Sequence, residues 1–327
     1  MSNKAGDLSL PEKIRSQLKL PVIAGPMFLV SGPELMIACA RAGVIGSFPT
    51  LNARTPEILE EWMQRIDVAT SQPGAAPCAP NLIVHPTNSR YEPDLEVILK
   101  HKPPMVIASV GNPKRVIDSV KPYGGVVFAD VISIKHARRA VSHGVDGLIL
   151  ICAGAGGNTG SLSPFAFLDQ VRQFFDGPVA IAGGLSNGRH IHLIEEMGAD
   201  FAYMGTRFIA TTESLAKDAY RQMIVDSDAD DVLTTTEVTG IPANWLLKSL
   251  EQTGFLASKV KHQGNFTLDK EIEMLRAWRD IWGAGHGVGG ISSVESVADV
   301  VAEMRRDYES AKRGDVARPG LRASLAA

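Results

Sequence analysis

Eight short apolar runs, each followed by a longer segment, constrain the fold of this chain more than any other feature of its 327 residues. The runs are too short for helices and rich in Val and Ile, so they predict buried parallel strands. They are PVIAG from Pro21, GVIGSF from Gly43, NLIV from Asn81, MVIAS from Met105, GVVFAD from Gly125, DGLILI from Asp146, GPVAIAGG from Gly177 and DFAYMGT from Asp200.

The segments between the runs carry the signals of amphipathic helices. Thr55 followed by Pro56 predicts an N-cap and a first helical residue, and Asn112 followed by Pro113 repeats this pattern. Gly43 stands where a helix is expected to stop. Eight strand–helix units predict an α/β fold, a (β/α)8 TIM barrel. A doubly wound open sheet is the alternative, but the count of eight favours the barrel.

The pattern changes after about residue 212, where strands become rare. We expect residues 1–212 to form the barrel and residues 213–290 to form a mainly helical cap over its mouth. Residues 291–327 are expected to form a last helix packed on the barrel and a tail that frays after Gly314.

Composition excludes several classes of protein. The net charge of −3 and the 6% of aromatic residues argue against nucleic acid as a partner. No apolar run is long enough to span a membrane, and the N-terminus lacks the apolar core of a signal peptide. The three cysteines have no spacing typical of metal sites or disulfides, so we expect a reduced, cytoplasmic protein without a metal.

Two neighbouring strands end in glycine-rich turns, AGGLSNG and MGTRF. In barrels the chemistry lies at the carboxyl ends of the strands, and the last two loops commonly bind phosphate through free backbone N–H groups. The predicted phosphate ligands are Gly183, Gly184, Gly205 and Thr206. The alternative is that these glycines only make tight turns.

Other strand ends carry candidates for ligand contacts. The turn AGPMF, with Ala24, Gly25, Pro26 and Met27, offers a backbone N–H and a thioether to a flat ring. The amide of Asn81 can reach a ring edge, and its strand can begin earlier than the run NLIV. Asp130 ends the fifth strand, where its carboxylate can bond a sugar-alcohol chain or a basic group, or simply cap a turn.

The sixth strand ends in AGAGGNTGS, a loop of small residues that leaves room for a ligand. Gly154, Gly156 and Gly160 resemble a dinucleotide fingerprint, but their spacing is wrong, which argues against a Rossmann site. The predicted ligand contacts in this loop are Ala153, Gly156, Gly157, Gly160 and Ser161, with Asn158 as a catalytic candidate.

Two histidines are candidates for acid–base chemistry near neutral pH. His286 lies in WGAGHGVGGI between two glycines, and His85 follows the third strand. A turn residue bonded to backbone is the alternative for His286. The absence of a Ser-centred nucleophile elbow and of an HExxH motif disfavours a hydrolase.

The motifs PVIAGPMF, NLIV, HARRAVSHGVDGLIL, GAGGNTGSLSPFAF, GPVAIAGGLSNG, GADFAYMGTRFIATTES, TGIPANWL and WGAGHGVGGI occur in this order. Together they resemble the nitronate monooxygenase family of FMN-containing (β/α)8 enzymes, formerly called 2-nitropropane dioxygenases. The resemblance covers residues 20–291. It implies FMN at the barrel mouth, with its phosphate on Gly183, Gly184, Gly205 and Thr206 and its ring beside residues 25–27 and Asn81.

Two positions depart from the family's usual residues. The sixth loop has Asn158 where the family usually has His, and Asp130 stands where a basic residue is often found. Asn158 cannot take a proton at neutral pH, which argues against oxidation of neutral nitroalkanes unless His286 or His85 serves as the base.

The resemblance implies an FMN-dependent oxidoreductase that oxidises nitronate-like small organic substrates with O₂. The alternatives are an NAD(P)H-dependent reductase of quinones or activated C=C bonds, a flavin-binding protein without turnover, and a flavin-free phosphate-binding lyase or isomerase. A homodimer is compatible with each of them.

Overall fold

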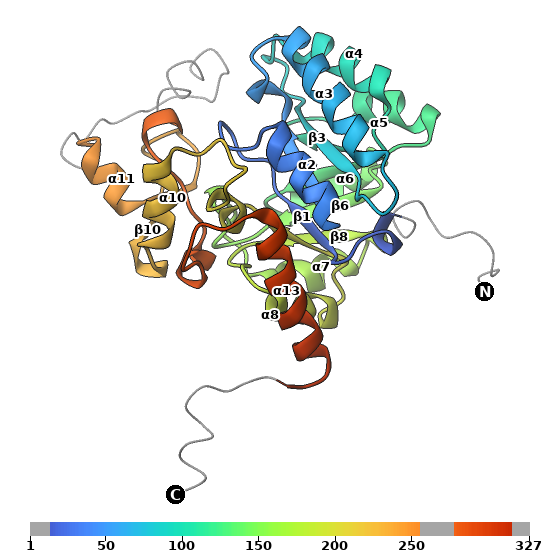
Figure 1. Ribbon diagram of the computed structural model, residues 1–327. Helices are drawn as coiled ribbons and strands as arrows, with labels where there is room; N and C mark the ends of the chain where they lie inside the picture. Colours follow the sequence, from blue (N-terminus) through green and yellow to red (C-terminus); the bar gives the residue numbers. More distant parts are fainter. Residues whose placement is uncertain (1–13, 256–277, 316–327) are drawn as a thin grey trace, which may run out of the picture.

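The computed structural model describes residues 14–255 and 278–315, which form a closed barrel of eight parallel strands with a cap (Figure 1). Pairing of β1 with β9 closes the barrel, so the prediction of a (β/α)8 fold is confirmed and the open sheet is excluded. The barrel strands are β1 (Val22–Ala24), β2 (Ile45–Pro49), β3 (Cys78–Ile83), β4 (Met105–Ser109), β5 (Val126–Val131), β6 (Gly147–Ile151), β8 (Val179–Ala182) and β9 (Phe201–Met204).

Helices surround the barrel and follow the capping signals in most places. Thr55 Oγ1 accepts a hydrogen bond from Ile58 N, as expected of an N-cap. At Asn112 the prediction was one residue off, because Pro113 is itself the N-cap residue and Asn112 Oδ1 accepts from Lys114 N. The helices are α2 (Pro33–Ala42), α3 (Pro56–Thr70), α4 (Tyr91–His101), α5 (Lys114–Val120), α6 (Ile134–Ser142), α7 (Pro164–Arg172), α8 (Gly188–Glu196) and α13 (Val297–Lys312).

The strands alternate between side chains that fill the barrel and side chains that pack against the helices. On β5, Val126 and Phe128 lie in the cluster inside the barrel, whereas Val127 and Ala129 belong to the outer core. Phe128 meets Phe201 edge to face in the lower part of the barrel. The same alternation turns Asp130, two residues beyond Phe128, toward the barrel interior at its carboxyl end.

The segment between β9 and α13 caps the barrel and is less helical than the sequence suggested. It contains α9 (Thr206–Ile209), α10 (Asp218–Val225), β10 (Val232–Thr235), β11 (Ala243–Leu246) and α11 (Leu247–Gln252). β11 pairs antiparallel with both β10 and β7 (Gly157–Asn158). Figure 1 shows this cap in gold and orange beside the barrel. The predicted cap residues 256–277 and the tail from 316 lie outside the described residues.

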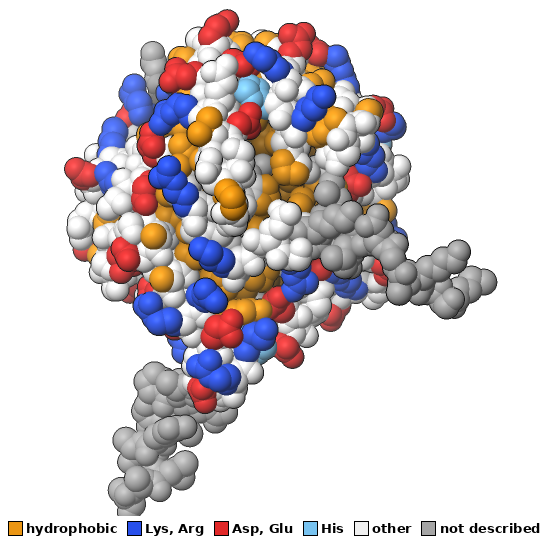
Figure 2. Space-filling view, turned by 45° about the vertical axis from the view of Figure 1, so that its right-hand side comes forward, with side chains coloured by type: hydrophobic (Ala, Val, Ile, Leu, Met, Phe, Trp, Pro, Cys, Tyr) orange, Lys and Arg blue, Asp and Glu red, His pale blue; other side chains and the backbone are white. Residues whose placement is uncertain are grey.

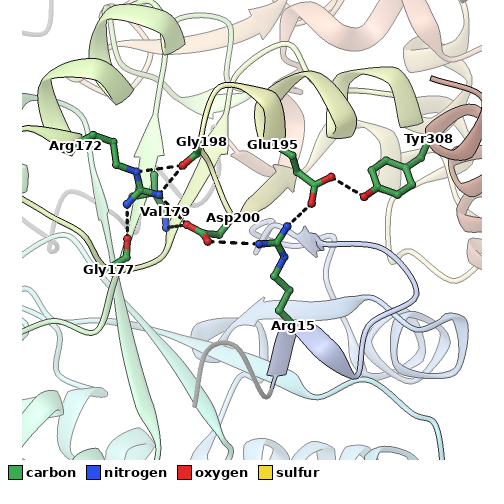
Figure 3. Close-up of polar contacts among 8 residues, drawn as sticks. All are labelled: Arg15, Arg172, Gly177, Val179, Glu195, Gly198, Asp200 and Tyr308. Carbon is green, nitrogen blue, oxygen red and sulfur yellow. Dashed lines mark hydrogen bonds and ion pairs between the residues drawn. The ribbon is translucent and has the colours of Figure 1, made fainter. Parts of the chain in front are cut away.

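A network of ion pairs and hydrogen bonds connects α7, α8 and α13 to the amino ends of β8 and β9 (Figure 3). Arg172 donates to Asp200 and to the carbonyls of Gly177 and Gly198. Arg15 bridges Asp200 and Glu195, and Glu195 also accepts from the hydroxyl of Tyr308 on α13. This network lies at the end of the barrel that contributes to stability rather than to chemistry.

The outer surface mixes both signs of charge, with apolar side chains between them on the face that Figure 2 shows. A groove of about 920 Å³ lies between α2 and α13, where Lys19, Arg41 and Arg305 border small apolar residues. In the described part of the chain, no helix combines the length and apolar character needed to cross a bilayer.

We predict that Gly188→Ala destabilises the protein, although the same change in an ordinary helix adds stability. A Cβ at Gly188 would collide with the backbone of Met304 and Tyr308, where α13 packs on α8. The expected loss in the free energy of unfolding is about 1–3 kcal/mol, measured by urea denaturation. Glu196→Ala, on the exposed face of α8, is the control and should change stability by less than about 0.5 kcal/mol. A stabilised Gly188→Ala protein would contradict this packing.

Candidate active site

A cavity of about 970 Å³ opens at the carboxyl ends of the barrel strands. Strand-end loops form its floor, and residues of the cap, among them Leu215, Tyr220, Trp278 and Trp282, form its roof. The volume is at the upper end of the range for cofactor and ligand sites. This cavity therefore lies at the end of the (β/α)8 barrel where the chemistry of such enzymes takes place.

Most residues predicted for the site lie together in the wall of this cavity. Those that line it are Gly25, Pro26, Met27, Asn81, His85, Asp130, Gly156, Gly157, Asn158, Gly183, Gly184, Gly205 and Thr206. Those that do not line it are Ala24, Ala153, Gly160, Ser161 and His286.

The residues outside the wall have structural explanations. Ala24 is fully buried in the core between barrel and helices. A side chain at Gly160 would collide with the carbonyl of Ile151, so glycine is needed there for packing. Ala153 N donates to Leu162 O, which fixes the base of the loop. The ligand contacts predicted for these residues and for Ser161 have no support in this geometry and stay predictions.

The floor of the cavity carries a polar row across three adjacent strands. Asn81 Nδ2 donates to Ser109 Oγ at 2.6 Å, and Ser109 Oγ donates to Asp130 Oδ2 at 2.6 Å. β3 begins at Cys78, so Asn81 lies near the carboxyl end of its strand and not at its start. Ser109 was missed, although its place as the last residue of the run MVIAS was a usable signal.

Burial raises the pKa of the Asp130 carboxyl to about 6, and the hydrogen bond from Ser109 limits this rise. Tyr203 on β9 also lines the cavity, and its pKa is held well above the ordinary value by burial and by the charge of Asp130. A carboxyl group that titrates near neutral pH in a cleft is typical of functional sites.

Two non-glycine residues with left-handed backbone conformation lie in the cavity wall, Leu29 (φ 61°) and Val110 (φ 57°). Such conformations cost about 1–3 kcal/mol each and cluster at functional sites. Buried Asn52 holds the first of these turns, since it accepts from Leu29 N and donates to the carbonyls of Met27 and Ser31.

The turn around Met27 corrects one expectation from the sequence. The Met27 N–H was expected to face a ring, but it donates to Ser31 Oγ at 3.0 Å. The Gly25 N–H is likewise used, because it donates to Met204 O. Of the two groups predicted there, only the Met27 thioether remains for a ligand.

The sixth loop is joined to the cap. Asn158 pairs with Ala243 and Gly157 with Asn244 in the small sheet, and buried Asn244 donates to Ala155 O at 2.7 Å. The Asn158 side chain is exposed to the cavity and has no hydrogen-bond partner among the described residues. The loop therefore presents a free amide from a fixed backbone.

The two phosphate-candidate loops lie beside the sixth loop. Gly184 N donates to Gly154 O at 3.2 Å, and Thr206 Oγ1 accepts from Gly285 N at 2.9 Å. Gly183 and Gly184 have φ values of 139° and 69°, and a side chain at Gly184 would meet no atom within 4 Å. Gly184 therefore borders open space in the wall of the cavity, although its own N–H is already bonded to Gly154 O.

The two candidate histidines differ in position. His85 lines the cavity, with its Nδ1 2.9 Å from Thr87 Oγ1. His286 is exposed and lies behind the wall, although the neighbouring Gly285 and Gly287 line it. The His286 N–H donates to Gly154 O at 3.0 Å, which fits the alternative of a turn residue. A catalytic role for His286 stays a prediction.

The wall has an excess of positive charge. Among its described residues, Asp130 is the one carboxylate, whereas Arg139, Lys217 and Arg279 are cations. Arg279 is paired with the exposed carboxylate of Asp280. A cavity of this composition favours anionic ligands.

A closed barrel whose strand ends open into a glycine-lined cavity beneath an aromatic cap has the architecture of a (β/α)8 enzyme. The sequence profile described as nitronate monooxygenase matches residues 75–307. The chain therefore belongs to the nitronate monooxygenase family, as the order of its motifs predicted, and it is a flavin-dependent oxidoreductase.

Individual relatives are distant. A hydroxy-methyl-oxo-octahydroindene-carboxyl-CoA dehydrogenase of Rhodococcus jostii is 27% identical over 72% of this chain, which spans 65% of that protein's length. A nitronate monooxygenase of Paraburkholderia phytofirmans is 26% identical, over 72% of this chain and 75% of its own. The structure of FabK from Thermotoga maritima superposes with a TM-score of 0.78 at 23% identity, over 94% of this chain and 98% of the other, and so shares the fold.

We predict that Asn52→Ala destabilises the protein, because it leaves the Met27 and Ser31 carbonyls without a donor and Leu29 N without an acceptor. The expected loss in the free energy of unfolding is about 2–3 kcal/mol, measured by urea denaturation. Gln64→Ala, on the exposed face of α3, should cost less than about 0.5 kcal/mol. Equal stabilities of the two variants would show that Asn52 does not hold the turn.

Proposed function

We propose that this protein is an FMN-dependent oxidoreductase that oxidises small anionic organic substrates of the nitronate kind, with O₂ as electron acceptor. The observation that carries the proposal is the cavity at the barrel mouth, which joins glycine-rich strand ends, a positive wall and a free amide at Asn158.

The residues present fit FMN. Gly183, Gly184, Gly205 and Thr206 line the cavity beside a wall rich in cations, and Gly184 borders open space, so these residues would hold the phosphate. The Met27 thioether and the Asn81 amide would line the ring. When bound, FMN supplies the acceptor for the two electrons of the oxidation and transfers them to O₂.

Asn158 favours a substrate that arrives as an anion. A neutral nitroalkane must lose its α-proton to a base, and an amide is not one at neutral pH. A nitronate has already lost that proton and carries the negative charge that the wall attracts. Asn158 would then orient the substrate by donating a hydrogen bond.

A second candidate is NAD(P)H-dependent reduction of a quinone or of an activated C=C bond next to a carbonyl. The observation that favours it is the name of the Rhodococcus jostii relative, a dehydrogenase of a carboxyl-CoA. Asn158 can donate to such a carbonyl, and His85 lines the same cavity as a candidate proton donor.

We predict that the oxidised protein with FMN bound is bleached under anaerobic conditions by propane-2-nitronate about 100-fold faster than by 2-nitropropane at the same pH. The reason is that general-base catalysis, which the neutral substrate needs, contributes about 10²–10⁴-fold. The measurement is the stopped-flow decay of the flavin absorbance.

Asn158→His should lower the ratio of the two rates of flavin reduction, because the new histidine speeds reduction by the neutral nitroalkane. The matched control is Ser161→His, a histidine in the same loop but outside the cavity wall, which should leave the ratio unchanged. Faster bleaching by NAD(P)H than by the nitronate would contradict the leading proposal and favour the second.

We predict that Gly184→Ala weakens FMN about tenfold or more but leaves riboflavin binding nearly unchanged, because the new methyl group enters the space beside the phosphate loops. The measurement is the dissociation constant of each flavin for the apoprotein, from quenching of flavin fluorescence.

Gly198→Ala is the matched control for backbone strain. Gly198 has a φ of 93° and open space around its Cβ position, as Gly184 does, but it ends α8 away from the cavity. Both variants should lose stability through the left-handed alanine, by about 1 kcal/mol. Equal weakening of FMN and riboflavin by Gly184→Ala would place the phosphate elsewhere.

A further inference from the structure

Asp130 is a carboxylate in a cavity whose other charged wall residues are basic, yet none of them pairs with it. It is half-buried, and among the described residues its side-chain partner is the neutral hydroxyl of Ser109. Structural carboxylates in such places normally have a cation beside them. Without a cation beside it, the Asp130 carboxyl is suited to a role in its protonated, neutral form.

The hydrogen bonds beside Asp130 run in one direction. The Ile107 carbonyl only accepts, so the Asn81 atom 3.3 Å from it is the Nδ2 donor. The same Nδ2 donates to Ser109 Oγ, and the single hydroxyl hydrogen of Ser109 is left for Asp130 Oδ2. Oδ2 is thus an acceptor, and a proton added to Asp130 goes to Oδ1.

No cation holds the negative charge of Asp130. The Ser109 hydroxyl and the backbone N–H groups of Val110 and Asp130 stabilise the ionised carboxyl, but burial outweighs them. β4 contributes Ser109 and the strained turn at Val110, whereas β6 contributes the apolar Ile149 beside it. Across the barrel, β9 contributes Tyr203, a neutral phenol. The other ionisable side chains in the described wall are His85, His136, Arg139, His143, Lys217 and Arg279. Asp130 forms no ion pair within the described part of the chain.

A ligand that fills the cavity displaces the water that solvates Asp130. Removing water from a carboxylate without supplying a cation favours its protonated form. A phosphate-bearing ligand adds further negative charge to the cavity and acts in the same direction. Binding and protonation are therefore linked.

We propose that Asp130 takes up a proton when a flavin binds and then serves as a proton-donating subsite, with Oδ1 donating a hydrogen bond to an acceptor on the ligand, such as a ring carbonyl. The inference rests on the proposed flavin site. Asn81 and Ser109 are positioning residues in it, because they fix which oxygen carries the proton.

The pKa of Asp130 in the protein without ligand decides whether flavin affinity rises or falls with pH. The pKa of Asp130 is about 6 without ligand, so the carboxyl is ionised above that pH and must be protonated on binding. Each pH unit above about 6 then costs close to tenfold in flavin affinity, until the pKa of the complex is reached.

The experiment measures the dissociation constant of FMN for the apoprotein between about pH 6.5 and 8.5, by fluorescence quenching. The wild-type constant should rise by up to about 100-fold over this range relative to that of Asp130→Asn, which imitates the protonated acid. Ionisation of the FMN phosphate affects both proteins alike and cancels in the comparison. Asp118→Asn, an exposed change on α5, should behave as wild type.

Parallel pH profiles of wild type and Asp130→Asn would overturn the inference while leaving the flavin site intact. Failure of the wild type to bind FMN at any pH would overturn the proposed function itself. A second variant guards against misfolding of Asp130→Asn. Ser109→Ala removes the donor that stabilises the ionised carboxyl, so its affinity should begin to fall at a higher pH than that of the wild type, and an unchanged onset would contradict the linkage.

Discussion

Closure of the eight-stranded barrel is the constraint on which the site depends. Once β1 pairs with β9, the period of two along each strand decides which side chains face inward. Below the mouth these are apolar, as with Ile107 and Phe128, but the next inward positions on the same strands are Ser109 and Asp130. The polar row at the cavity floor is thus the last layer of the barrel core, with polar residues in place of apolar ones.

Rigid loops and the cap turn this layer into a site. Asn52 fixes the turn after β1 by three hydrogen bonds, and Asn244 fixes the sixth loop to the cap sheet. Two buried amides therefore hold the floor and the roof of the cavity while the side chain of Asn158 stays free. Strain at Leu29 and Val110 is tolerated because these neighbours determine the backbone.

The sequence predicted the barrel well because each strand is a compact, mostly apolar run between helix signals. The sequence also predicted most of the residues in the cavity wall, because the carboxyl ends of barrel strands always meet at one end of the barrel. It did not predict β7, because a two-residue strand leaves no periodic signal, and it missed Ser109, although this residue ends the run MVIAS. The catalytic role of His286 and the ligand contact of Gly160 stay predictions, since the first lies behind the wall and the second packs against Ile151, positions that only the folded loops reveal.

The most direct test of this account is a crystal structure of the protein with FMN bound. We expect the flavin ring above the row formed by Asn81, Ser109 and Asp130, with the phosphate beside Gly183, Gly184 and Gly205. The amide of Asn158 should face the ring across the space for the substrate. A flavin bound outside the barrel mouth, or a mouth that stays empty of flavin at saturating FMN, would contradict it.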